Sequence, residues 1–350
     1  MTTPAASRAA RVIERGWSRE ASPFHQGEQQ VQSRVGVRAQ VERAGRNMIR
    51  EQLPEQHRAL FEVLPLLVVG SQASDGRLWA SLLSGEPGFV RSPTAKILRI
   101  QAQPLEGDPL TQQLSVGAPL GLLGIQLETR RRNRSNGRIV ARDASSFSVQ
   151  VEQSFGNCNQ YIQAREPEFD RELLAAAHPP RAEGSLISEQ ARQLLESTDT
   201  FFIATASAAA GSGGDGEGVD VSHRGGRPGF VRVQNDATRT RLTVPDFSGN
   251  FIFNTLGNLE INPRAGIVCA DFATGDVLQL TGKAHAIWDG PELEAFEGAE
   301  RLLNFDVESG VFLARALPLR FHGFNPSPDL AETGTWAEAA QNSARHDSTS

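Results

Sequence analysis

The sequence has few of the features that mark membrane, disulfide-rich or nucleic-acid-binding proteins. Its apolar runs all stay well below the roughly 20 residues that a membrane-spanning helix needs, so no membrane association is expected. The only two cysteines, Cys158 and Cys269, are too few for a disulfide framework and favour a reducing, cytoplasmic location. A net charge of −6 provides no overall attraction to nucleic acid.

Motifs that usually identify an enzyme are missing as well. The sequence contains no Walker loop, no Cys-x-x-Cys pair, no nucleophile elbow and no dinucleotide fingerprint opening a βαβ unit. No spacing of His, Cys or carboxylate residues predicts a metal site or a catalytic triad. The catalytic residues are therefore unknown at this stage.

What the sequence does contain is an internal repeat. The heptad Gly85-Glu-Pro-Gly-Phe-Val-Arg91 returns as Gly226-Arg-Pro-Gly-Phe-Val-Arg232, with six of seven positions identical. The offset of 141 residues (226 minus 85) is about the length of a domain and far too long for a solenoid repeat. A chain of 350 residues can form two cores. We therefore expect two copies of one fold in tandem.

Short apolar segments separated by turn signals predict a mainly β fold. Before the first strands, helices are expected at 31–50 and 56–64, and Asp75-Gly76 and Asn136-Gly137 are expected as tight turns. Many short strands at close spacing are typical of a barrel or sandwich and not of a parallel α/β sheet. The expected strands are 66–70, 78–83, 97–102, 119–127, 139–143 and 147–155 in the first copy, and 200–207, 219–222, 230–234, 241–244, 250–254, 265–271 and 276–288 in the second.

The same patterns predict the division of the chain. A helix over 188–196, capped by Ser188, belongs to the segment between the copies, and the Ala/Gly/Ser-rich stretch 208–218 is expected as a flexible insertion in a hairpin. The predicted parts are a flexible arm (1–22), a first domain with N-terminal helices (23–165), a helical linker (166–199), a second domain (200–324) and a disordered tail (325–350).

The second copy carries five blocks that point to a known family. They are Ser222-His-Arg-Gly-Gly-Arg-Pro-Gly-Phe-Val-Arg232, Leu242-Thr-Val-Pro-Asp-Phe-Ser-Gly-Asn250, Phe253-Asn-Thr-Leu-Gly-Asn258, Asn262-Pro-Arg-Ala-Gly266 and Gln279-Leu-Thr-Gly-Lys-Ala284. In this order and spacing they resemble the pyridoxamine 5'-phosphate oxidase-like FMN-binding split barrels, over about a quarter of the chain. The resemblance implies two tandem split β-barrels with peripheral helices, packed as an internal pseudo-dimer.

The residues themselves agree with a flavin mononucleotide site. Arg224, Gly225 and Gly226 supply a cation on a backbone that can approach a phosphate closely. The segment Asn254-Thr255-Leu256-Gly257-Asn258 leads into a helix, whose free N–H groups can hold an anion. The resemblance further implies that the flavin ring lies beside one strand and receives hydrogen bonds from another. The candidate cofactor-binding residues are Ser222, His223, Arg224, Gly225, Gly226, Phe230, Val231, Arg232, Asn254, Thr255, Gly257, Asn258, Gln279 and Thr281.

Each of these segments also has an ordinary structural interpretation. Arg-Gly-Gly-Arg could be a solvated turn, and Asn-x-x-Gly-Asn could be helix punctuation. His223 is the histidine placed best for an active-site role, and a ring contact without chemistry is the alternative. The resemblance of the first copy to the flavin pattern is weaker, so one cofactor site per chain is expected, built mostly on the second copy.

Two further clusters stay open. The arginines between Arg130 and Arg138 are expected at a hairpin tip, where they could reach a phosphate or remain a solvated basic loop. His25, Glu28, Gln32 and Arg34 could line a substrate entrance.

The predicted function is FMN-dependent redox chemistry on a small-molecule substrate, with electrons leaving to oxygen or a reductase partner. Deazaflavin, FAD or haem are alternative ligands. A non-catalytic flavin carrier or sensor, or a degenerate scaffold for a protein or nucleotide partner, are the alternative functions, and a homodimer is open.

Overall fold

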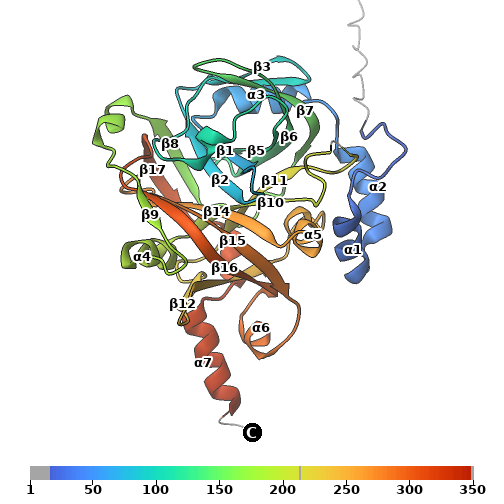
Figure 1. Cartoon of the computed structure of the whole chain (residues 1–350). Helices are drawn as coiled ribbons and strands as arrows, with labels where there is room; N and C mark the ends of the chain where they lie inside the picture. The colour runs from blue at the N-terminus through green and yellow to red at the C-terminus, as the bar shows by residue number, and fades with distance from the viewer. Residues whose placement is uncertain (1–15, 213, 348–350) are drawn as a thin grey trace, which may run out of the picture.

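The computed structural model describes residues 16–212 and 214–347, and Figure 1 shows their arrangement. The helices are α1 (Gln26–Arg34), α2 (Arg38–Met48), α3 (Glu55–Val63), α4 (Glu189–Ser197), α5 (Asn254–Ile261), α6 (Pro291–Ala295) and α7 (Trp336–Asp347), with 3-10 helices η1 (Pro109–Gln112), η2 (Arg171–Ala176) and η3 (Pro328–Glu332). The strands are β1 (Leu66–Gln72), β2 (Leu78–Ser84), β3 (Val90–Thr94), β4 (Ile97–Ile100), β5 (Pro119–Gln126), β6 (Arg131–Arg142), β7 (Phe147–Gly156), β8 (Ala164–Phe169), β9 (Arg181–Glu183), β10 (Thr200–Ala206), β11 (Val219–Gly225), β12 (Arg232–Asn235), β13 (Thr240–Phe247), β14 (Arg264–Ala270), β15 (Val277–Ile287), β16 (Ala299–Leu313) and β17 (Leu319–Asn325).

Two large antiparallel sheets make up most of the protein, which confirms the prediction of a mainly β fold. The first sheet has the strand order β2-β1-β5-β6-β7-β4-β3, and the second has β11-β10-β14-β15-β16-β13-β12, with β9 added beside β16. The two orders are the same when each strand is replaced by its counterpart in the other half. Over the described residues, the outer strands of each sheet do not pair with each other, so neither sheet is closed. The first sheet has seven strands where six were expected, and the second has eight with β9 where seven were expected.

The sheets share one apolar core and each has a second core of its own. In β1, Leu67 and Val69 belong to the core of the first half, while Leu66 and Val68 belong to the shared core. This alternation follows from the two-residue period of a strand, and it explains why β1 is apolar on both faces. Phe202 of β10 meets the first half in the shared core. The shared core therefore joins the halves as tightly as a domain interior.

Two glycines allow the sheets to approach at related places. A Cβ on Gly121 of β5 would lie 2.6 Å from the carbonyl oxygen of Val219 in β11. A Cβ on Gly266 of β14 would lie 2.4 Å from the carbonyl oxygen of Leu78 in β2. Because β5 corresponds to β14 and β2 to β11 in strand order, the same backbone contact occurs twice. Any larger side chain at either position would push the sheets apart.

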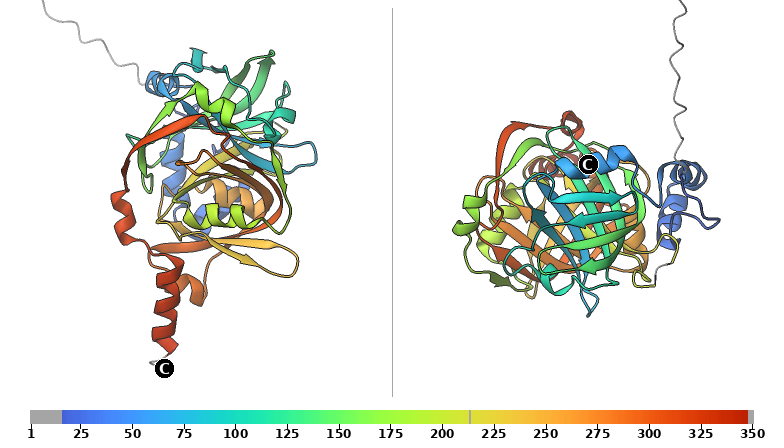
Figure 2. Two further views of the ribbon diagram at one scale, coloured as in Figure 1. Left: turned by 90° about the vertical axis from the view of Figure 1, so that its left-hand side faces the viewer. Right: turned by 90° about the horizontal axis from the view of Figure 1, so that it is seen from above.

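The helices lie at the edges of this two-sheet body. α1 and α2 lie together on one flank, next to α5, and α7 projects from the second half (Figures 1 and 2). Ser188 accepts a hydrogen bond from the Ala191 backbone N–H and caps α4, as its sequence predicts. No helix within residues 16–212 or 214–347 is long and apolar enough to cross a membrane.

Several expected elements differ from the observed ones. The single helix expected over 31–50 is two helices, because the chain turns at Gly36, whose φ of +76° favours glycine. Asn136-Gly137 is not a turn but lies inside β6, at a shift in register. The segment 250–254 is a loop leading into α5 and not a strand. The tail expected to be disordered contains η3 and α7.

The predicted insertion and the predicted linker between the halves can also be compared with the structure. Residues 208–218 connect β10 to β11, as expected of an insertion in a hairpin. The segment between the halves is not only helical, since it includes β8, which pairs with β17. Most of the arm predicted over 1–22 lies outside the described residues.

Candidate functional site

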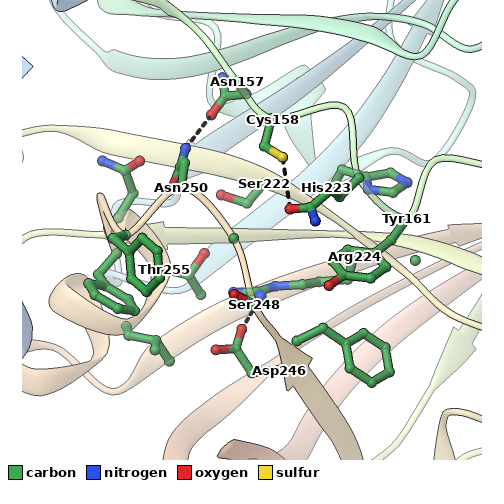
Figure 3. A pocket seen from close by; sticks show the side chains of 18 of the residues that line it. Asn157, Cys158, Tyr161, Ser222, His223, Arg224, Asp246, Ser248, Asn250 and Thr255 are labelled. Carbon is green, nitrogen blue, oxygen red and sulfur yellow. Dashed lines mark hydrogen bonds and ion pairs between the residues drawn. The ribbon is translucent and has the colours of Figure 1, made fainter. Parts of the chain in front are cut away.

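A cleft lies where the two halves meet, and Figure 3 shows its side chains. The first half contributes β5, β6 and the segment after β7, and the second half contributes β11, β13, the following loop and the start of α5. Its lining residues are Leu123, Arg132, Arg134, Asn157, Cys158, Gln160, Tyr161, Ser222, His223, Arg224, Gly225, Pro245, Asp246, Phe247, Ser248, Gly249, Asn250, Phe251, Phe253, Asn254, Thr255, Leu256 and Arg301. We call this cleft the inter-half pocket.

Of the predicted arginine cluster, Arg130 lies in the hairpin turn at residues 127–130, and the other arginines lie along β6. Alternate side chains of β6 point toward the second half. Arg134 is 2% exposed, forms an ion pair with Asp220, and donates from Nη2 to Ser222 Oγ at 2.6 Å. Asp220 Oδ1 also accepts from Asn136 Nδ2 at 2.7 Å. Arg134 therefore forms a buried connection between the halves, whereas Arg131 at the start of β6 is exposed.

A second cationic group comes from the other half. Arg224 forms an ion pair with Asp246 Oδ1, and Arg301 Nε donates to Asp246 Oδ2 at 2.8 Å. Arg301 also lies over the ring of Phe253, 5.2 Å from its centroid. One carboxylate therefore holds two guanidinium groups at one wall of the inter-half pocket.

Arg132 differs from these arginines because it forms no ion pair with any described residue. Its Nε donates to the carbonyl oxygen of Cys158. Burial, together with the charges of Arg134 and Arg224, lowers the pKa of Arg132 to about 10. It remains protonated near neutral pH, so the pocket lining contains four arginines and one carboxylate, while Asp220 and Glu300 pair with Arg134 and Arg301 from outside the lining. Such a lining favours an anionic ligand.

The loop between β13 and α5 brings backbone N–H groups to the same pocket. The helix begins at Asn254, and its N-cap residue, Phe253, makes no side-chain capping hydrogen bond. The first N–H groups of a helix have no partner within the helix, and they carry partial positive charge. Phe251 and Phe253 have φ angles of +57° and +65°, which non-glycine residues rarely adopt.

His223 is the one histidine of the pocket lining. It is 6% exposed, and its ring lies 5.6 Å from that of Phe202 in an edge contact. Burial, and then the charges of Arg132 and Arg224, lower its pKa well below the usual value, so the ring is neutral. Its Nε2 is buried and has no hydrogen-bond partner among the described residues.

Six of the fourteen candidate cofactor-binding residues line the pocket, and the other eight lie elsewhere. Those that line it are Ser222, His223, Arg224, Gly225, Asn254 and Thr255. Phe230 and Val231 are instead buried in the core of the second half, where Phe230 stacks on Phe201. Gly226 lies against the Phe230 ring. Arg232 pairs with Glu292 and covers Trp336 on a different surface.

The other four candidates lie at packing contacts. Gly257 contacts the backbone of Glu28, since an added Cβ would lie 2.5 Å from the Glu28 Cα. Asn258 is fully buried and donates to Thr205 Oγ1 and Asp220 Oδ2, at 3.0 and 2.8 Å. Gln279 and Thr281 are buried in β15. A cofactor contact from any of these eight residues stays a prediction that this geometry does not favour.

Sequence reasoning gave no role to several residues of the pocket. Asp246 lies in the block Leu242–Asn250, and its position before a glycine-containing loop could have suggested a place in the site. Arg301 lies on β16, a strand that the pattern did not predict. Cys158 and Tyr161 follow β7, and burial raises the pKa of Tyr161 to about 12. Among the described residues, no group of three or more His, Cys, Asp or Glu side chains could hold a metal ion.

Comparisons with known proteins give only distant matches. No family model and no curated protein matches the sequence. The solved structure of HupZ from group A Streptococcus is 15% identical and aligns over 35% of this chain and 90% of its own, with a TM-score of 0.27. A pyridoxamine 5'-phosphate oxidase candidate from Lactobacillus delbrueckii is 15% identical over 37% and 94%, with a TM-score of 0.27. The haem storage protein HutZ from Vibrio cholerae is 15% identical over 37% and 95%, with a TM-score of 0.24. TM-scores below 0.5 carry no argument, so a function must be argued from this chain's own residues.

Proposed function

We propose that this protein binds one FMN in the inter-half pocket and uses it in redox chemistry on a small molecule. The observation that carries the proposal is the charge of the lining: four arginines line the pocket beside the uncapped start of α5, and one of them, Arg132, forms no ion pair with any described residue. A phosphate monoester is a dianion near neutral pH, and guanidinium groups and helix N–H groups are its usual partners. The bound flavin would supply reversible two-electron chemistry.

The phosphate would be held mainly by Arg132 and Arg224. Arg132 has no carboxylate to release before it binds an anion, and Arg224 has a buried Nε without a partner. The N–H groups and hydroxyl of Asn254 and Thr255 would complete the contacts from α5. All four groups belong to one pocket but come from β6, β11 and α5, so the site requires both halves.

The aromatic part of the lining suits a flat ring system. Tyr161 and Phe247 lie 5.1 Å apart between centroids, and both line the pocket. Two unpartnered polar atoms, Asn157 Nδ2 and His223 Nε2, are available for the polar edges of the ring. Because His223 is neutral and buried, it would give or accept a hydrogen bond without carrying a charge at that position.

We further infer that the halves are two copies of a split barrel and that only one copy of the site remains open. Ser222 and Ser81 are 141 residues apart, the same offset as the repeated heptads. Arg134 donates to Ser222, and at the corresponding place Gln279 Nε2 donates to Ser81 Oγ at 3.0 Å. There, the buried Asp108 accepts from Ser81 Oγ at 2.8 Å. An uncharged amide and a carboxylate replace the cation, so a second phosphate would not bind.

A haem is the second candidate, favoured by one specific observation. The buried Nε2 of His223 has no partner and lies in the pocket, as a haem ligand would need. The arginines of the pocket could then pair with the propionate carboxylates of the haem in place of the phosphate of FMN.

The absorption spectrum of the freshly purified protein separates these possibilities. Bound FMN gives a flavin spectrum and an FMN mass after heat release, with one equivalent per chain on titration. A haem spectrum that is lost in His223→Ala would favour the second candidate. A colourless protein that takes up neither FMN nor haem would overturn the proposed function. Reduction of the bound flavin by a nicotinamide donor, followed by reoxidation in air, would distinguish an enzyme from a carrier.

A further inference from the structure

Helix α1 contacts the loop and helix that line one side of the inter-half pocket, although it lies more than 200 residues earlier in the chain. Gln32 is fully buried, and its Nε2 donates to the carbonyl oxygen of Ile252 at 3.1 Å. Arg38 Nη1 donates to Gln32 Oε1 at 3.1 Å, and this contact orients the amide so that its nitrogen faces Ile252. The side chain therefore holds one loop carbonyl from behind the pocket.

A second contact holds the first residue of α5. Glu28 is 2% exposed, and its Oε1 accepts from Asn254 Nδ2 at 2.5 Å. Its Oε2 accepts from the backbone N–H of His25 at 3.0 Å, in the capping box of α1. The same carboxyl group thus caps the start of α1 and holds the first residue of α5.

Backbone packing brings the two helices close enough for these contacts. A Cβ on Gly27 would lie 2.0 Å from the Gly257 carbonyl oxygen, and a Cβ on Gly257 would meet the Glu28 backbone at 2.5 Å. Both positions therefore require glycine. Beyond the end of this contact, Arg34 covers the Trp288 ring at 4.1 Å, and Arg301 of the pocket lies 5.3 Å from the same ring centroid.

The loop held in this way has a costly backbone conformation. Phe251 and Phe253, on either side of Ile252, both have positive φ angles. Non-glycine residues in the left-handed region cost of order 1–3 kcal/mol each, and they persist only where surrounding contacts fix them. Ile252 itself belongs to a small core with Phe24 just before α1, Val41 of α2, Ile49 just after α2, and Phe155 of β7. The contacts that oppose this strain therefore come from α1 and its neighbours.

We propose that α1 holds the loop between β13 and α5 (residues 248–253) in place, like a clamp. Gln32 and Glu28 of α1 are the positioning residues. They hold Ile252 and Asn254 so that the N–H groups at the start of α5 face the inter-half pocket. Neither side chain lines the pocket, so they act through the loop and not on the ligand. This inference rests on the proposed function for its consequence, FMN affinity, but the clamp itself can be tested without any ligand.

The test compares Gln32→Met with Gln30→Met by amide hydrogen exchange in the ligand-free protein. Methionine keeps the size and helix propensity of glutamine but cannot donate to Ile252. Gln30 is exposed on the same helix and is the matched control. We expect Gln32→Met to speed exchange of the amides at 251–257 on the order of tenfold, the usual effect of one lost hydrogen bond. The amides of β10 and β14 should keep their rates, whereas a general loss of stability would speed them too.

FMN titration of the same variants tests the consequence. We expect about tenfold weaker binding for Gln32→Met and unchanged binding for Gln30→Met. Unchanged exchange at 251–257 in Gln32→Met would overturn the clamp, and so would faster exchange with unchanged FMN affinity. If the parent protein binds no FMN, the proposed function fails, while the exchange rates still decide whether α1 holds the loop.

A second variant covers the case in which Gln32→Met does not fold. Glu28→Met keeps about the length of the side chain but offers no strong hydrogen-bond acceptor, so both His25 and Asn254 lose their partner. Faster exchange at 254–257 with unchanged rates in β10 would support the clamp. Unchanged rates at 254–257 would overturn it.

Discussion

Two arginines that the sequence placed in one site are separated by the structure, and this separation can be measured. Arg224 lines the inter-half pocket, whereas Arg232 lies outside it. They are otherwise closely matched: their side chains are 21% and 22% exposed, and each pairs with one carboxylate, Asp246 or Glu292. Replacing each by glutamine therefore removes the same charge at two different places.

The expected difference follows from the contacts of each arginine. A charge-assisted contact to a phosphate contributes about 1.5–3 kcal/mol, so Arg224→Gln should weaken FMN binding by about 10- to 100-fold. The freed oxygen of Asp246 would add repulsion, but its second oxygen keeps Arg301 at 2.8 Å, so the variant is expected to fold. Arg232→Gln should change the affinity less than twofold, because it alters no pocket contact.

Quenching of FMN fluorescence during titration measures both affinities, and thermal melting checks that both variants are folded. Added salt should reduce the difference between parent and Arg224→Gln, since the lost term is electrostatic and partly exposed to solvent. Equal losses in the two variants, or a larger loss in Arg232→Gln, would refute the assignment of the phosphate to this pocket.

Three further predictions test the pocket, the interface and the pH response. Cys158 lines the pocket and is half-buried, while Cys269 is 1% exposed, so a thiol reagent should modify one cysteine per native chain. Bound FMN should slow the modification of Cys158, and an unchanged rate would place the ligand elsewhere. Gly266→Ala should lower the free energy of unfolding by about 1–3 kcal/mol, whereas Gly156→Ala, with its nearest atom 3.6 Å away, should be nearly neutral in the same urea titration. Burial, and then nearby arginines, lower the pKa of His57 to about 4, so the folded state disfavours its protonation and stability should fall as pH drops from 6.5 toward 4. Between pH 7 and 5 the parent should lose about 1–2 kcal/mol more than His57→Gln, and equal losses would contradict this.

The strands were largely predictable because their pattern is local. The segment 66–70 is apolar on both faces and ends near an Asp-Gly turn, and β1 and β2 form that hairpin. The repeated heptad predicted two related halves, and the strand orders of the two sheets agree with that expectation. The prediction of a tight turn at Asn136-Gly137 was wrong, because the dipeptide that favours a turn also fits a shift of register within a long strand.

The pocket was predictable only where its residues belong to contiguous segments. Ser222 to Gly225 and Asn254-Thr255 line it because each is a short run at the end of one element. Arg132 and Arg134 could not be assigned from sequence alone, since a run of arginines is more often solvated and only the pairing of the halves buries it. Gln32 and Glu28 were noticed as a cluster, but their partners, Ile252 and Asn254, lie more than 200 residues away.

Gln279, a candidate that the resemblance implied, lies at a contact between the halves and not in the lining of the inter-half pocket. In strand order β15 is the counterpart of β6, so Gln279 corresponds to Arg134 and lies at the second, related contact between the halves. A pattern matched to one copy cannot say which of the two contacts would hold the proposed ligand, because both use a strand of each half. Both contacts contain a buried carboxyl group, Asp220 at Arg134 and Asp108 at Gln279, but Arg134 also lies near Arg132 and Arg224, which favours its contact for an anion. Burial raises the pKa of Asp108 to about 6, so near neutral pH the ionised form still prevails and its charge would repel a phosphate there. Binding of a single FMN per chain would therefore follow from the divergence of the two contacts, even though the backbones of the halves stay alike.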